Sequence, residues 1–210
     1  PVLPPWEDLA TQASRLVVGA AEKETAPVFT AGVTTESAVA AGFATAWQRA
    51  FGSSLAFAPE LAWEDRWILS ALDRCATDAN RCFAEWRLNE GTARIYDFFW
   101  HDFCDWYLEL AKVRLYGEGE RRAVLAVMLY VLGESMKLMH PLMPYVTEEI
   151  WSALPMAKGL LIESRYPAGD GRAVDEEAEG RMGLLRDVVV AVRNVRRDAM
   201  QQVKDLLKDK

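Results

Sequence analysis

Basic side chains gather near the end of the chain. Segment 181–210 carries eight Lys and Arg against four Asp, a net of about +4, although the whole chain has a formal net charge of −7. At helical spacing, one stripe of this segment collects Arg186, Arg193, Arg197, Lys204 and Lys208. Clustered cations supply most of a protein's affinity for nucleic-acid phosphate. The stripe therefore favours a phosphate-binding surface, and a solvated helix face is the alternative.

Cysteines and histidines are the side chains that could hold a metal or transfer a proton. Cys75 and Cys82 share one face of a predicted helix, where they could pair around a metal with His101. The alternative is that they are small buried apolar residues, which is how free cysteines usually behave. Zinc needs four close ligands, so we predict no metal site. Three scattered cysteines indicate a reducing compartment, the cytoplasm or an organelle matrix.

Neither histidine is placed for catalysis. His101 precedes Asp102, but neighbours on a helix point about 100° apart and cannot form a relay. His140 precedes Pro141 at a predicted helix end, where a histidine commonly bonds the last carbonyls. The sequence also contains no G-x-x-x-x-G-K-[ST], H-E-x-x-H or G-x-S-x-G pattern. We therefore predict no catalytic residue and no cofactor in this chain.

The element that must organise the others is an aromatic-rich helix over 88–116. At helical spacing one face carries Ile95, Phe99, Phe103, Trp106, Leu110 and Val113, and a second apolar stripe carries Tyr96, Trp100 and Tyr107. A helix with two apolar faces has neighbours on more than one side. We therefore expect this helix to lie at the centre of an all-α bundle.

The same periodicity predicts further helices over 40–51, 64–86, 121–139, 147–154 and 177–207, with a short extended segment over 159–167. We expect 61–210 to form the bundle and 1–60 to be a partly helical N-terminal segment, with a helix over 9–21. No apolar run reaches the roughly 20 residues that span a bilayer, and the chain opens without a secretory signal. Because Pro1 is not an initiator methionine, the chain is expected to be processed, trimmed or part of something longer.

Several stretches resemble one known family. RLNEGTARIYDFFWHDFCDWYLELAK (87–112) is similar to the central helix of the anticodon-binding domain of valyl-tRNA synthetases, and HPLMPYVTEEIW (140–151) is similar to the motif that follows it. DRWILSALD and VVVAVRNVRRDAM resemble the second and last helices of that bundle. The resemblance implies the helical bundle of class I aminoacyl-tRNA synthetases, which binds tRNA. The HIGH-like and KMSKS-like motifs of the catalytic core are absent.

The resemblance also implies which residues meet tRNA. Arg66 and Trp67 are expected to read a base by stacking and hydrogen bonding. The alternative for Trp67 is a core residue at a helix start, since large aromatic side chains are usually packed. Arg193, Arg196 and Arg197 are expected to contact phosphates, with a solvated face as the alternative. Arg49, in AWQRAF, is a weaker candidate of the same kind.

Three functional interpretations remain open. The first is the tRNA-anticodon-binding portion of a valine–tRNA ligase, whose partners are valine-accepting tRNA and the catalytic core of the parent enzyme. The second is a descendant of that domain that serves as a structural helical subunit of a larger, ribonucleoprotein assembly, which the acidic net charge favours. The third is a helical interaction module with no role in RNA binding.

Overall fold

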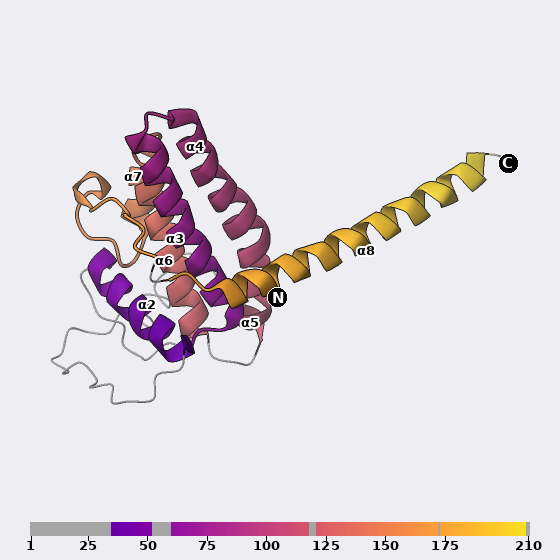
Figure 1. Ribbon diagram of the computed structural model, residues 1–210, viewed down its shortest axis with the longest axis horizontal. Coiled ribbons are helices and arrows are strands. Elements are labelled where there is room, and N and C mark those ends of the chain that lie inside the picture. Colours follow the sequence, from indigo (N-terminus) through magenta and orange to yellow (C-terminus); the bar gives the residue numbers. More distant parts are fainter. Residues whose placement is uncertain (1–34, 52–59, 118–120, 172, 209–210) are drawn as a thin grey trace. The chain divides into compact units, whose positions relative to one another are not determined.

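The regular structure of the described residues is helical throughout. The computed structural model describes residues 35–51, 60–117, 121–171 and 173–208 (Figure 1). Every element within these ranges is a helix, which confirms the all-α prediction. The helix predicted over 9–21 lies outside the described residues.

The chain divides into two compact units, Pro1–Val174 and Asp175–Lys210. The second unit consists mainly of one long helix, α8 (Glu176–Lys208), as predicted over 177–207. The predicted division into 1–60 and 61–210 stays a prediction, because most of its first part lies outside the described ranges. Among the described helices, none is long and apolar enough to cross a membrane.

A helical hairpin forms one side of the first unit. It pairs α3 (Trp63–Ala84) with a long helical arm made of α4 (Leu88–Asp97), η1 (Phe98–Tyr107) and α5 (Leu108–Tyr116). Trp86 makes the turn between them with a φ of 60°, a left-handed conformation that often ends a helix. The predicted helices over 64–86 and 88–116 are thus confirmed.

The arm differs from prediction in which side chains face inward. Residues Phe98–Tyr107 are π-helical, with more residues per turn than the α-helix on which the predicted face was built. The phase of the inward face shifts accordingly, so Tyr107 is fully buried whereas Val113 is 76% exposed. Tyr96 and Trp100 are also exposed, and their rings stack with centroids 6.3 Å apart. The predicted inward position of Val113 is therefore wrong.

Helix α6 (Arg122–Met139) lies at the centre of the first unit. Every residue from Gly133 to Met139 is buried, and Val124, Val127 and Val131 are fully enclosed. A helix that is buried all round has neighbours on every side. The central position predicted for the 88–116 helix therefore belongs to α6.

Two shorter elements follow α6. Helix α7 (Pro144–Ala153) begins three residues before the predicted start, because Pro144 occupies its first turn, where a missing N–H costs nothing. The segment predicted to be extended contains a 3-10 turn, η2 (Leu161–Glu163). Thr147 is buried and donates its hydroxyl to the Met143 carbonyl, which stabilises the start of α7.

Helix α2 (Thr35–Phe51) packs its aromatic side chains against α6 and α7. The ring of Phe43 meets Tyr130 edge-on at 5.4 Å, and Phe51 stacks on Trp151 at 6.0 Å. Trp47 lies between these contacts and is fully buried. The predicted helix over 40–51 is confirmed, although α2 begins five residues earlier, at Thr35. Its packing places α2 beside the cavity described below.

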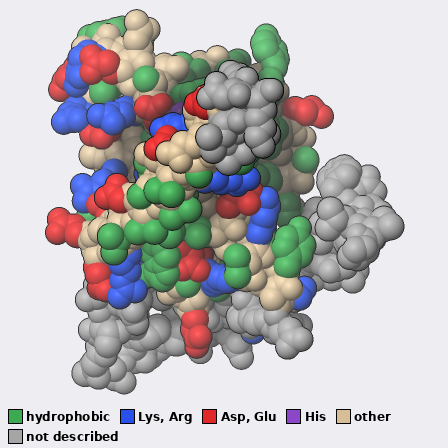
Figure 2. All heavy atoms as spheres, turned by 90° about the vertical axis from the view of Figure 1, so that its right-hand side faces the viewer, with side chains coloured by type: hydrophobic (Ala, Val, Ile, Leu, Met, Phe, Trp, Pro, Cys, Tyr) green, Lys and Arg blue, Asp and Glu red, His purple; other side chains and the backbone are tan. Residues whose placement is uncertain are grey.

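The surface carries a mixture of side-chain types. Acidic, basic and hydrophobic side chains are interspersed on the face drawn in Figure 2. On that face, the net charge of −7 therefore does not produce one continuous acidic surface.

Candidate functional site

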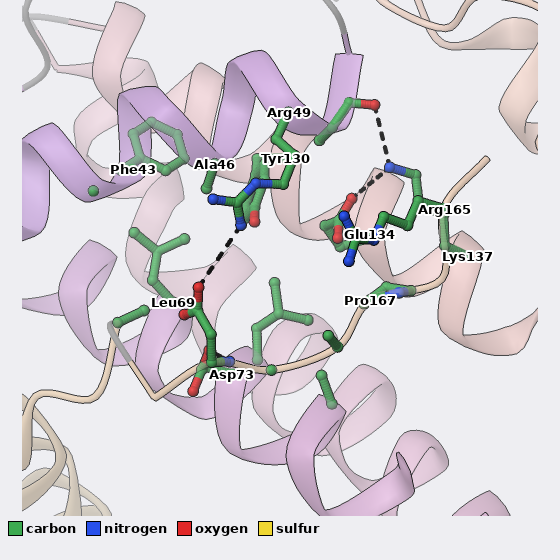
Figure 3. Close-up of a pocket in the computed structure, with 18 of the residues that line it drawn as sticks. Phe43, Ala46, Arg49, Leu69, Asp73, Tyr130, Glu134, Lys137, Arg165 and Pro167 are labelled. Carbon is green, nitrogen blue, oxygen red and sulfur yellow. Dashed lines mark hydrogen bonds and ion pairs between the residues drawn. The ribbon is translucent and has the colours of Figure 1, made fainter.

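The first unit contains a cavity of about 710 Å³ (Figure 3). Its walls come from α2, α3, α6 and the loop over 164–171, which are far apart in the sequence. The side chains labelled in the close-up are Phe43, Ala46, Arg49, Leu69, Asp73, Tyr130, Glu134, Lys137, Arg165 and Pro167. This volume falls in the range of about 300–1,000 Å³ in which proteins bind small molecules.

Aromatic and aliphatic groups form part of the cavity wall. Phe43 and Tyr130 meet edge-to-face there, with Leu69 on the facing helix α3. Burial raises the pKa of the Tyr130 hydroxyl well above its ordinary value, and the charge of Glu134 adds to this. The hydroxyl therefore stays protonated, so it can donate a hydrogen bond as well as accept one.

A buried ion pair forms the floor beside α6. The Lys137 ammonium donates to Glu134 Oε1 at 2.6 Å and to the Ala50 carbonyl at 3.2 Å. It also lies 5.4 Å from the ring centroids of both Phe51 and Trp151. Lys137 is 5% exposed, so this ammonium mainly neutralises Glu134 and ties the end of α2 to α6.

Arg49 supplies an accessible cation to the same cavity. Its side chain is 53% exposed, and Nη1 lies 3.7 Å from Oδ2 of Asp170 on the loop. Figure 3 shows the guanidinium extending from α2 across the cavity. The ion pair therefore joins the two sides of the cavity at its solvent-facing edge.

The loop that closes the cavity is held to α3 by side chains of that helix. Asn80 Nδ2 donates to the Pro167 carbonyl at 2.8 Å. The two carboxylate oxygens of Asp73 accept the backbone N–H groups of Asp170 at 3.0 Å and Gly171 at 2.8 Å. These bonds fix the loop backbone, so this side of the cavity is preformed.

Gly169 allows the loop to approach α3 closely. Its φ is +67°, and a Cβ built on it would lie 2.2 Å from Oγ1 of Thr77. Any side chain at this position would therefore have to push the loop away from α3, in a backbone conformation that disfavours side chains anyway.

Arg66 and Trp67, predicted to read a tRNA base, lie near the start of α3. Arg66 is 3% exposed and Trp67 is 4% exposed, and neither is among the side chains that line the cavity. A base could stack on Trp67 only after the groups that cover the ring move aside. Their role in tRNA binding stays a prediction.

Arg193, Arg196 and Arg197, predicted to contact phosphates, lie on α8 in the second unit. All three are exposed to solvent. Arg197 Nε lies 3.7 Å from Asp198 Oδ1, in a pair whose side chains are 74% and 69% exposed. Their guanidinium groups are thus accessible to a phosphate, and the assignment stays a prediction.

Sequence reasoning missed the contribution of α6. Tyr130, Glu134 and Lys137 are spaced at i, i+4 and i+7, which places them on one helix face. A signal was present, because Glu134 and Lys137 interrupt an otherwise apolar helix. Buried charges in such a position are paired and mark either a structural tie or a site.

The surroundings of the cysteines and histidines indicate structural roles for these side chains. Burial raises the pKa of Cys75 to about 12, with a further contribution from the charge of Asp102, so its thiol is unreactive. His101 Nδ1 lies 3.1 Å from Asp105 at the surface, and His140 Nδ1 lies 2.8 Å from the Thr147 hydroxyl. Within the described residues, no three His, Cys, Asp or Glu side chains are grouped to hold a metal.

Comparison with known proteins gives a consistent assignment. The model of the family described as "Anticodon-binding domain of tRNA ligase" matches residues 65–206. A valine–tRNA ligase of Latilactobacillus sakei is 39% identical over 147 residues, covering 68% of this chain and 16% of the relative. One of Dehalococcoides mccartyi is 41% identical over 143 residues, covering 65% and 16%. The chain thus spans about one sixth of the length of these relatives, and it belongs to the family of anticodon-binding domains of tRNA ligases.

Proposed function

We propose that this chain binds the anticodon of a tRNA, specifically a valine-accepting tRNA, as the recognition part of a valine–tRNA ligase. The observation that carries this proposal is the family match over 65–206, together with relatives that are valine–tRNA ligases. Because the chain spans 16% of those relatives, aminoacylation is proposed for the longer protein and not for these residues.

The cavity in the first unit suits an unstacked anticodon base. Proteins read such bases by stacking on aromatic groups and by hydrogen bonds to the base edges. Tyr130 offers a half-buried ring with a hydroxyl. Glu134 and Asp73 offer carboxylates whose oxygens already accept from Lys137 and from the loop backbone, and which have further lone pairs. Carboxylates accept hydrogen bonds from the amino groups of bases, and Arg49 can donate to a base or a phosphate.

Phosphate contacts are proposed for the exposed arginines of α8. Arg193, Arg196 and Arg197 are accessible, and cations in such positions contribute affinity without reading sequence. The wider chain is acidic, with a net charge of −7. We therefore expect tRNA affinity to be moderate and to depend on this local basic stripe.

The proposed partners are a valine-accepting tRNA and the catalytic core of the parent ligase. The interpretation as a structural subunit of another assembly gains no support from the relatives. The proposed compartment is the cytoplasm or an organelle matrix, where Cys75, Cys82 and Cys104 would remain free thiols.

Binding of tRNA to the full chain tests this proposal. Fluorescence anisotropy compares a valine-accepting tRNA with the same tRNA in which only the middle anticodon base is changed. The changed base can still stack but loses its matched hydrogen bonds, which costs about 1–3 kcal/mol, so we expect affinity to fall about fivefold or more. Equal affinities for the two tRNAs would show that the chain does not read the anticodon.

A further inference from the structure

The Arg49–Asp170 ion pair suggests how access of RNA phosphates to Arg49 in the cavity is limited. We propose that the Asp170 carboxylate competes with RNA for Arg49. The carboxylate pairs with the Arg49 guanidinium until a phosphate of the bound RNA takes its place. This inference rests on the proposed function, because it assigns a regulatory contact to the same cavity.

The geometry of the pair suits exchange. Arg49 Nη1 and Asp170 Oδ2 are 3.7 Å apart, and the two side chains are 53% and 41% exposed. Ion pairs this exposed are held weakly, because water screens both charges. An incoming anion can therefore displace the carboxylate without first uncovering a buried group.

The loop does not depend on this pair for its position. Its backbone is already held by the Asp73 carboxylate, which accepts from Asp170 N and Gly171 N, and by Asn80, which donates to the Pro167 carbonyl. These bonds use the backbone of Asp170 and leave its carboxylate beside Arg49. The carboxylate can thus release the guanidinium while the loop stays in place.

Carboxylate and phosphate are chemically similar partners for the Arg49 guanidinium. A guanidinium binds carboxylate and phosphate in the same forked geometry, through charge-assisted hydrogen bonds. When a phosphate displaces the Asp170 carboxylate, Arg49 exchanges one anionic partner for another and is paired both before and after RNA binding.

The test compares two variants of the full chain that each remove one negative charge. Asp170→Asn removes the competitor, and Glu109→Gln removes an exposed carboxylate of α5 that pairs with Lys112 and does not line the cavity. With a valine-accepting tRNA, we expect Asp170→Asn to bind about two- to fivefold more tightly than Glu109→Gln, the range set by an exposed ion pair. In an Arg49→Gln background, this advantage should disappear.

The outcomes separate this inference from the proposed function. Equal affinities of Asp170→Asn and Glu109→Gln, or an advantage that persists without Arg49, would overturn the competitor role while anticodon discrimination by the wild type still stands. Weaker binding by Asp170→Asn would overturn it as well, since Asp170 would then support binding. Absence of tRNA binding in the wild type and all variants would overturn both proposals.

Discussion

Asp65→Ala is expected to lower the free energy of unfolding by about 3–5 kcal/mol, the cost of breaking a buried ion pair from one side. Asp65 is fully buried. Its carboxylate accepts hydrogen bonds from the Tyr107 hydroxyl at 2.7 Å and Arg114 Nη1 at 2.6 Å. It also accepts the Ala62 N–H at 3.0 Å. The substitution therefore removes the acceptor shared by three donors, and the Arg114 guanidinium keeps only the longer contact of 3.4 Å to Glu64 Oε1.

Two measurements sharpen this prediction. Burial raises the pKa of Tyr107, and the charge of Asp65 raises it further, so the hydroxyl is always a donor. Tyr107→Phe removes only that hydrogen bond and should cost about 0.5–1.5 kcal/mol. Urea unfolding followed by circular dichroism gives both values. A cost below about 1 kcal/mol for Asp65→Ala would mean that the network does not join α3 to the helical arm as described.

Lys137→Met is expected to destabilise the fold by about 3–5 kcal/mol at neutral pH, because it leaves the Glu134 carboxylate buried without its cation. Glu134 is 9% exposed and accepts from Lys137 Nζ at 2.6 Å. The methionine keeps most of the apolar stem against Phe51 and Trp151 but loses the ammonium above their rings. The expected loss is therefore mainly electrostatic.

The same variant should show a characteristic pH dependence. Burial raises the pKa of Glu134 above its ordinary value, and Lys137 opposes that rise. A folded-state pKa above the unfolded one means that stability falls as pH rises from the unfolded pKa through the folded pKa. Without Lys137 the folded pKa rises further, so that pH window widens upward.

Unfolding in urea at pH 5 and pH 8 measures this effect. Lys137→Met should recover part of its lost stability at pH 5, where Glu134 can take up a proton, and the exposed Lys158→Met provides the control. An equal loss at both pH values would show that the ammonium does not act through Glu134.

Hydrophobic periodicity predicted the long helices well because their apolar faces follow a regular α-helical repeat. The helices over 64–86 and 121–139 match α3 and α6 to within two residues at each end. The inward face of the helical arm was beyond this reasoning, since the π-helical segment Phe98–Tyr107 changes the number of residues per turn. The start of α7 was also missed, since the helix predicted from 147 begins at Pro144.

The cavity could not be predicted because it depends on tertiary packing. Arg49 and Asp170 are far apart in the sequence, and only the packing of α2 and the attachment of the loop to α3 bring them together. Arg66 and Trp67 illustrate the opposite difficulty. Every residue from Asp65 to Ser70 is buried, so this turn of α3 is covered on all sides, which local sequence cannot reveal.

The central claim is that the cavity reads the anticodon, and filling the cavity tests it most directly. Ala46 lines the cavity, and Ala46→Trp places a large ring where a base would enter. Ala84→Trp introduces the same side chain at an exposed position at the end of α3. The quantity to measure is the ratio of affinities for a valine-accepting tRNA and its copy with a changed middle anticodon base.

We expect Ala84→Trp to keep the wild-type ratio of about five or more, whereas Ala46→Trp should bring the ratio close to one. Circular dichroism confirms that both variants are folded. A wild-type ratio retained in folded Ala46→Trp would contradict the proposed role of the cavity, because the anticodon would then be read somewhere else.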